Sequence, residues 1–86
     1  MIFLIERVIN FIANLLVLVV FLDALLSFFL SPTNPLRNAL DRIVNPMLAP
    51  IRRVVPPLGG LDLSPLILII LIEIISYALI RIVSFL

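Results

Sequence analysis

The residues of this chain that could do chemistry are a few ionisable side chains set in long apolar stretches. Asp23 and Glu73 are carboxylates, and Tyr77 adds a phenol one helical turn after Glu73. Two carboxylates close together in a medium of low dielectric repel, so one of them would hold a proton. The pattern predicts either a proton or ion path through these three residues or hydrogen-bonded contacts between helices. We favour the second interpretation, because no segment resembles a selectivity filter.

Composition excludes several common chemistries. The chain has no His and no Cys, so zinc sites, disulfides and catalysis by thiolate or imidazole are ruled out. No Gly-rich phosphate loop, nucleophile elbow or HExxH motif occurs. The formal net charge of +1 gives no reason to expect nucleic-acid binding. We therefore expect a protein that is not an enzyme and that holds no metal or cofactor.

The elements that must position these side chains are two long apolar segments. Of the 86 residues, 64% are hydrophobic, whereas soluble domains contain roughly 45–50%. The runs 8–30 and 65–86 are each long enough, at about 1.5 Å per residue, to cross roughly 30 Å of hydrocarbon. These features predict an all-α membrane protein, a hairpin of two transmembrane helices.

The segment between the runs predicts an amphipathic helix. Apolar residues follow one helical stripe over 34–55, and the polar face is basic. Asn34 and Pro35 form a cap and first-turn pair. Pro46 and Pro50 lie inside the pattern, so we expect two short helices or one broken helix. Such a helix typically lies in the membrane interface, and packing on a soluble partner is the alternative. The basic residues are Arg37, Arg42, Arg52 and Arg53.

Turn residues precede the second run. They predict a turn rather than an element, after which Ser64 would cap the helix and Pro65 would occupy its first turn. The turn residues are Pro56, Pro57, Gly59 and Gly60. The chain is thus expected to be one unit over 1–86, divided into a first span at 1–30, a connector at 31–64 and a second span at 65–86.

Basic residues also predict the orientation. The connector has four Arg, whereas each terminal part has one, Arg7 or Arg81. The positive-inside rule then places the connector in the cytoplasm and both termini on the outer side of the cell (inner) membrane.

Polar residues form stripes on both expected spans. On the second span they fall within about 100° of one another, and on the first they are spaced by four. Counting residues from the connector places Asp23 at a depth similar to Glu73, and Asn14 at a depth similar to Arg81. A two-helix hairpin cannot shield these groups, which favours a homo-oligomer or other membrane subunits as partners. The stripes are Glu73, Ser76, Tyr77, Arg81 and Ser84, and Glu6, Asn10 and Asn14.

Two runs in the connector are distinctive: Asn45-Pro46-Met47-Leu48-Ala49-Pro50-Ile51-Arg52-Arg53 and Pro56-Pro57-Leu58-Gly59-Gly60-Leu61-Asp62-Leu63-Ser64-Pro65. With Asn34-Pro35-Leu36 and Asp41-Arg42-Ile43 before them, they resemble the YggT family, also called YlmG. The resemblance covers roughly residues 20–75. It departs from the family pattern at Asp23, where many members carry Arg, and at Glu73, where many carry Gln.

The resemblance implies a small membrane protein of bacteria or plastids. Roles suggested for the family are osmotic tolerance linked to potassium uptake, division and nucleoid organisation, and haem attachment in plastids. Their common ground is a membrane adaptor or assembly factor, in which the Arg52-Arg53 pair either binds anionic lipid or an acidic partner or only sets topology. The alternatives are a small accessory subunit of a respiratory or photosynthetic complex and an ion-conducting homo-oligomer.

Overall fold

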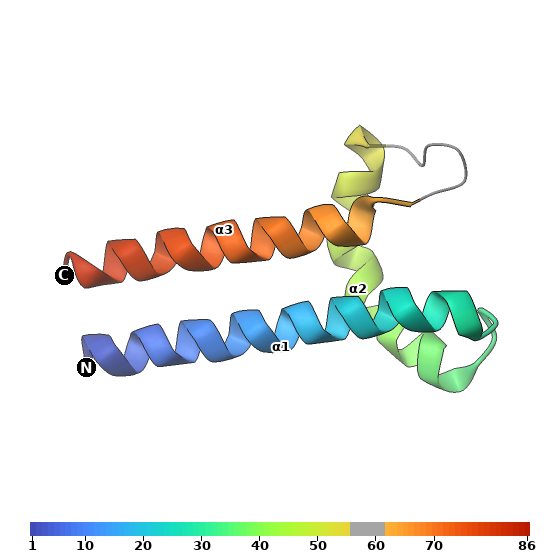
Figure 1. The fold of residues 1–86 in the computed structure, drawn as a ribbon, viewed down its shortest axis with the longest axis horizontal. Helices are drawn as coiled ribbons and strands as arrows, with labels where there is room; N and C mark the ends of the chain where they lie inside the picture. Colours follow the sequence, from blue (N-terminus) through green and yellow to red (C-terminus); the bar gives the residue numbers. More distant parts are fainter. Residues whose placement is uncertain (56–61) are drawn as a thin grey trace.

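Three helices make up the fold. The computed structural model describes residues 1–55 and 62–86, and its helices are α1 (Ile2–Phe29), α2 (Pro35–Val54) and α3 (Ser64–Ser84). In Figure 1, α1 and α3 lie side by side and antiparallel, with both chain termini at one end and α2 crossing at the other. The predicted hairpin with a helix between its two long arms is confirmed. The predicted turn at Pro56, Pro57, Gly59 and Gly60 lies outside the described residues.

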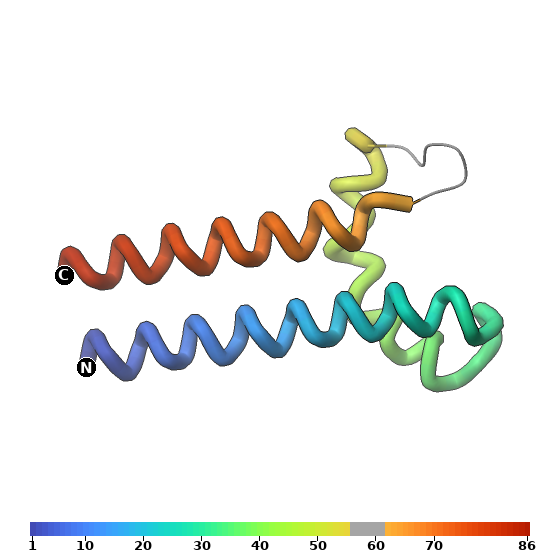
Figure 2. The backbone as a smooth tube through the Cα atoms, viewed as in Figure 1, coloured from blue at the N-terminus to red at the C-terminus, as the bar shows by residue number. Residues whose placement is uncertain are grey.

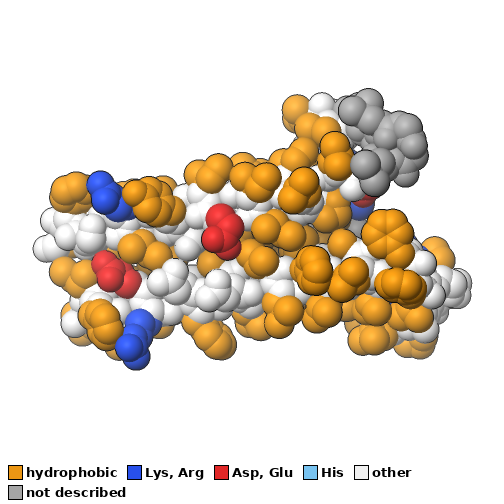
Figure 3. Space-filling view, in the orientation of Figure 1, with side chains coloured by type: hydrophobic (Ala, Val, Ile, Leu, Met, Phe, Trp, Pro, Cys, Tyr) orange, Lys and Arg blue, Asp and Glu red, His pale blue; other side chains and the backbone are white. Residues whose placement is uncertain are grey.

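Within the described part of the chain, α1 and α3 are the helices long and apolar enough to cross a membrane. Only 17% of the most apolar window of α1, and 6% of that of α3, is buried inside the protein. The core helix of a soluble protein would be mostly buried, whereas here hydrophobic side chains cover the outside of both helices (Figure 3). A surface of this kind is suited to lipid as its solvent.

A small core holds the three helices together at the connector end of the hairpin. Val20 of α1, Val44 and Leu48 of α2, and Leu68 of α3 form one buried cluster. Val20 and Val44 are 0% exposed and Leu48 is 1% exposed, so α2 is packed against both long helices rather than standing apart from them. This contact determines which face of α2 points inward.

The middle helix is continuous through its two internal prolines. We expected two short helices or one broken helix, but the structure has one unbroken helix with Pro46 and Pro50 inside it. Both prolines are exposed, and the trace in Figure 2 changes direction along α2. Each proline removes one backbone donor and crowds the preceding turn, which bends a helix without ending it when neighbouring contacts hold both halves.

The two later helices begin in different ways. At α2, Asn34 Oδ1 accepts hydrogen bonds from the backbone N–H of Leu36 (3.0 Å) and Arg37 (3.5 Å), so the predicted cap is confirmed. At α3 the prediction of Ser64 as the cap is wrong. Ser64 is the first helical residue, and its N–H donates to Asp62 Oδ1 at 3.0 Å. The aspartate two residues upstream reaches this N–H and takes the capping role. Pro65 lies in the first turn, as expected.

Candidate functional site

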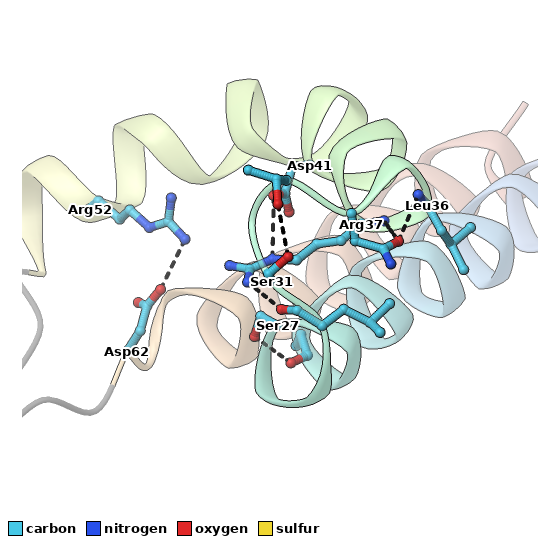
Figure 4. A network of polar contacts seen from close by, with 11 residues as sticks. Ser27, Ser31, Leu36, Arg37, Asp41, Arg52 and Asp62 are labelled. Carbon is cyan, nitrogen blue, oxygen red and sulfur yellow. Dashed lines mark hydrogen bonds and ion pairs between the residues drawn. The ribbon is translucent and has the colours of Figure 1, made fainter.

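A polar cavity of about 310 Å³ lies where the three helices meet. Asp23 and Ser27 enter from α1, while four polar residues come from α2 and Asp62 from the segment before α3. In Figure 4, the labelled polar side chains of these elements gather at the junction. The four residues from α2 are Arg37, Asp41, Asn45 and Arg52.

Arg37 closes the turn between α1 and α2. Its Nη1 donates a hydrogen bond of 2.7 Å to the carbonyl oxygen of Leu30, the residue that follows α1. Its Nε lies 3.6 Å from Asp41 Oδ2, one helical turn further along α2. The carbonyls at the end of a helix have no partner within the helix, so this guanidinium satisfies one of them while it is neutralised by Asp41.

Arg52 connects the end of α2 to the start of α3. Its Nη2 lies 2.9 Å from Asp62 Oδ2, and the two side chains point toward one another (Figure 4). Partial burial alone would raise the pKa of Asp62. The Ser64 backbone N–H and the Arg52 guanidinium outweigh that effect and hold the pKa of Asp62 below its usual value of 3.8.

Asp23 is the carboxylate of the cavity that forms no ion pair with an arginine of residues 1–55 and 62–86, and the Asp41 carboxyl group lies beside it. Asp23 is 5% exposed, and its Oδ1 has no hydrogen-bond partner among residues 1–55 and 62–86. Arg37 and Arg52 each face another aspartate, so the lining has one more carboxyl group than guanidinium groups. A buried polar atom in this state can accept a hydrogen bond from water or a small ligand, or hold a proton.

The sequence left open whether Asp23 and Glu73 are close together, and the structure places them far apart. The antiparallel register in which Val20 packs with Leu68 puts Asp23 level with Pro65, whereas Glu73 lies eight residues further along α3, about 12 Å away along the helix. Glu73 is exposed on the outer surface of α3. The expectation of similar depths is wrong because the last turns of α1 run past the beginning of α3 and lie over α2 (Figure 1).

The depth predicted for Asn14 is also wrong. A groove between the long helices is lined by residues 9–16 of α1 and 72–79 of α3, with Ala13 and Ser76 at its centre. This antiparallel register puts Asn14 level with Ile74 rather than with Arg81. Asn10, Asn14, Tyr77 and Arg81 are all exposed. The Arg81 guanidinium lies 5.8 Å from the centre of the Tyr77 ring, close enough for a cation–π contact.

The basic residues of the connector divide into two pairs. Arg37 and Arg52 line the cavity, although the Arg52 side chain is 41% exposed, whereas Arg42 and Arg53 lie outside the cavity and are exposed. In the part of the chain that the structure describes, the ion pairs involve only Arg37 and Arg52. The same part contains no group of three or more acidic side chains placed to hold a metal ion.

Sequence reasoning missed several residues of the cavity. Asp41 could have been found, because it follows Arg37 by four residues on a predicted helix and that spacing favours ion pairs. Asp62 stands two residues before the first turn of α3, where capping residues are common. Ser27 and Asn45 carry no comparable local signal, since only the packing of α2 brings them to the cavity.

The comparisons with known proteins agree on one family. The model of the family described as CCB3/YggT matches residues 2–83. The chain is 38% identical over 53 residues to the uncharacterized protein YggT of Escherichia coli (strain K12), a match that covers 62% of this chain and 28% of that protein. It is 42% identical over 57 residues to an uncharacterized protein from the proC 3' region of Vibrio alginolyticus, covering 66% of this chain and 31% of that one.

A third relative, an uncharacterized protein of Pseudomonas aeruginosa, is 48% identical over 40 residues, which are 46% of this chain and 20% of that protein. The matched segment therefore spans less than a third of the length of each of these relatives. No solved structure matches the chain. Because the family model covers nearly the whole sequence, the chain belongs to the CCB3/YggT family.

Proposed function

We propose that this chain is a non-enzymatic membrane adaptor or assembly factor. Its long helices α1 and α3 would anchor it in the cell membrane, and the outer face of α2 would bind an acidic partner protein or anionic lipid headgroups. The observation that carries the proposal is the division of the connector arginines. Arg37 and Arg52 each form an ion pair with an aspartate, whereas Arg42 and Arg53 are exposed and form no ion pair with residues 1–55 and 62–86.

The two exposed arginines form one surface. Arg42 and Arg53 are eleven residues apart, which is about three helical turns, so the helical period puts them on the same side of α2, one before and one after its prolines. Asn38 and Ala49 are exposed on the same side of α2. At one end of this surface, a hollow of about 330 Å³ is lined by Arg42 and Asn38 with three neighbours, Thr33, Pro35 and Ala39. A basic surface of this kind attracts anionic groups at a membrane.

The interior of the protein supports a binding role rather than a chemical one. In the cavity, Arg37 forms an ion pair with Asp41, and Arg52 forms one with Asp62. Among the described residues of the cavity, Ser27 is the hydroxyl side chain, and its Oγ donates to the carbonyl oxygen of Ala24 rather than to a base. A hydroxyl group becomes an effective nucleophile when a general base accepts its proton.

The proposal also includes an orientation of the hairpin in the membrane. With four arginines in the connector and one in each terminal part, the connector would lie in the cytoplasm and both termini on the outer side. The basic surface of α2 would then face the leaflet and the compartment in which anionic headgroups and cytoplasmic partners are found.

Purification in mild detergent followed by native mass spectrometry tests the proposal. We expect wild type to carry substoichiometric, exchangeable partners or anionic lipids, and the R42Q/R53Q variant to lose most of them. The matched control is R7Q/R81Q, which removes the same charge at the other end of the hairpin and should keep them. The orientation of each variant in the membrane is mapped first. Inverted insertion of R42Q/R53Q would mean that these arginines set the orientation of the protein rather than bind a partner.

Two other results would contradict the adaptor. Recovery of the chain at fixed stoichiometry in one large complex, unaffected by R42Q/R53Q, would indicate an accessory structural subunit. Recovery of a homo-oligomer alone, together with ion flux in liposomes that is lost in the D23N/E73Q variant, would indicate conduction.

A further inference from the structure

One broad face of the hairpin carries polar side chains midway along both long helices. Ala13 and Ser76 are buried where α1 meets α3. On each helix, an exposed polar residue stands three positions before and one position after this contact residue. These residues are Asn10 and Asn14 on α1, and Glu73 and Tyr77 on α3.

These four side chains lie on the same side of the hairpin. A residue three before or one after the contact residue is rotated from it by about 60° or 100° in the same sense. Because α1 and α3 run antiparallel (Figure 1), equal rotations from the line of contact bring both stripes to one face. Ile12 and Ile75 are rotated the other way, and both line the apolar groove of about 250 Å³ on the opposite face. We call the first the polar face.

The polar residues of the two helices are matched in depth. The register of the groove, with residues 9–16 alongside 72–79, puts Asn14 level with Ile74 and Asn10 level with Ala78. Asn14 is therefore within about 1.5 Å of the level of Glu73, and Asn10 within about 1.5 Å of the level of Tyr77.

This arrangement is self-complementary. If a second copy is rotated by half a turn about an axis parallel to the helices, α1 of one copy faces α3 of the other and no residue changes its depth. Asn14 then faces Glu73 of the second copy, and Asn10 faces Tyr77 of the second copy. The same two pairs recur across the axis, as an isologous interface requires.

We propose that the polar face is a self-association surface, at which two copies pair in the membrane through Asn14–Glu73 and Asn10–Tyr77 contacts. The Asn14 amide donates to the Glu73 carboxyl group, and the Tyr77 hydroxyl donates to the Asn10 carbonyl oxygen. Polar groups that face lipid chains have no hydrogen-bond partner, and helices in membranes associate through such groups. This inference does not depend on the arginines of α2.

The test is energy transfer between donor- and acceptor-labelled copies in lipid vesicles over a range of protein-to-lipid ratios. The chain has no Cys, so a single introduced cysteine gives one label per copy. We expect wild type to associate, and N14L/E73L to raise the dissociation constant by about tenfold or more, because the two-fold axis removes each contact twice. E73Q keeps a hydrogen-bonding side chain and should stay within about threefold of wild type.

Two tryptophan variants distinguish the faces. N14W places bulk on the polar face and should block pairing, whereas I12W places it on the groove face of the same helix and should leave pairing intact. Far-ultraviolet circular dichroism checks that every variant remains helical. The proposal is overturned if wild type shows no association at any ratio, if N14L/E73L associates like wild type, or if I12W blocks pairing and N14W does not.

Discussion

At the level of single residues, the arginines of the connector differ in what they contact. Arg37 satisfies a carbonyl at the end of α1, and Arg52 pairs with Asp62 before α3, while Arg42 and Arg53 point outward. The sequence identified all four as a basic set but could not divide them, because the division depends on which side of α2 packs inward. That side is determined by Val44 and Leu48 in the core.

The Arg52–Asp62 ion pair makes the free energy of unfolding depend on pH. Since the folded pKa of Asp62 is lowered, its contribution is present above the unfolded value of 3.8 and is lost as the pH falls below it through the folded value. The side chains are 41% and 37% exposed, so we expect the effect to be at most about 1 kcal/mol.

Thermal unfolding in detergent, followed by circular dichroism as a function of pH, checks this expectation. D62N keeps an oxygen that can cap α3 but loses the charge, so it should be slightly less stable than wild type at neutral pH and lose less stability on acidification. Parallel pH profiles for wild type and D62N would contradict the assignment.

Asp23 shows what a sequence reveals of a site and what it leaves open. A carboxylate in an apolar run is costly and was recognised as needing a partner. The sequence left open whether Glu73 lies near Asp23, and the structure places Asp23 away from Glu73, in the cavity beside the connector. The direction in which a side chain points around a helix is set by the contacts of that helix, and those come from segments distant in sequence.

At the level of elements, local signals predicted most of the boundaries. The first span was expected at 1–30 and the helix is Ile2–Phe29, and the second was expected at 65–86 and the helix is Ser64–Ser84. Apolar length, prolines and caps are properties of neighbouring residues, so they can be read without the fold. The continuity of α2 through Pro46 and Pro50 could not, because it depends on contacts that hold both halves of the helix.

The start of α2 gives a prediction at this scale. N34A removes the oxygen that accepts the N–H groups of Leu36 and Arg37, and loss of such a cap costs about 1 kcal/mol. We expect faster hydrogen exchange in the first turn of α2, with little change in α1. N34D supplies an equivalent oxygen and should exchange like wild type. Equal exchange in N34A and wild type would show that the cap does not stabilise this turn.

At the level of the whole molecule, the chain consists of two long helices, the arms, and a third helix that packs across one end of them. The arms α1 and α3 contact each other along their length, while α2 is held at one end through Val44, Leu48 and the polar contacts of the cavity. The cavity, the basic surface of α2 and the polar face therefore all depend on how α2 and the arms are packed. The order of the three helices was predicted from sequence, but the overhang of α1 over α2 was not, because no local signal sets where two helices meet.

We expect that the packing of α2 can be weakened without separating α1 from α3. L48A removes a side chain that is 1% exposed and should destabilise the packing of α2 by about 2–5 kcal/mol. Because the groove between α1 and α3 is lined by other residues, the arms should keep their contact. L48A should then lose hydrogen-exchange protection throughout α2 and expose the cavity, while protection of α1 and α3 near the termini is retained.

L36A is the matched control, since Leu36 is on the same helix but 58% exposed. It should leave the protection of α2 close to that of wild type. If L48A lowered protection equally in α1, α2 and α3, the three helices would unfold as one cooperative unit. Helix α2 would then not unfold separately from the pair formed by α1 and α3. Uniform loss of hydrogen-exchange protection would also mean that the basic surface of α2 cannot move independently of α1 and α3. Binding at α2 would then change the stability of α1 and α3 directly.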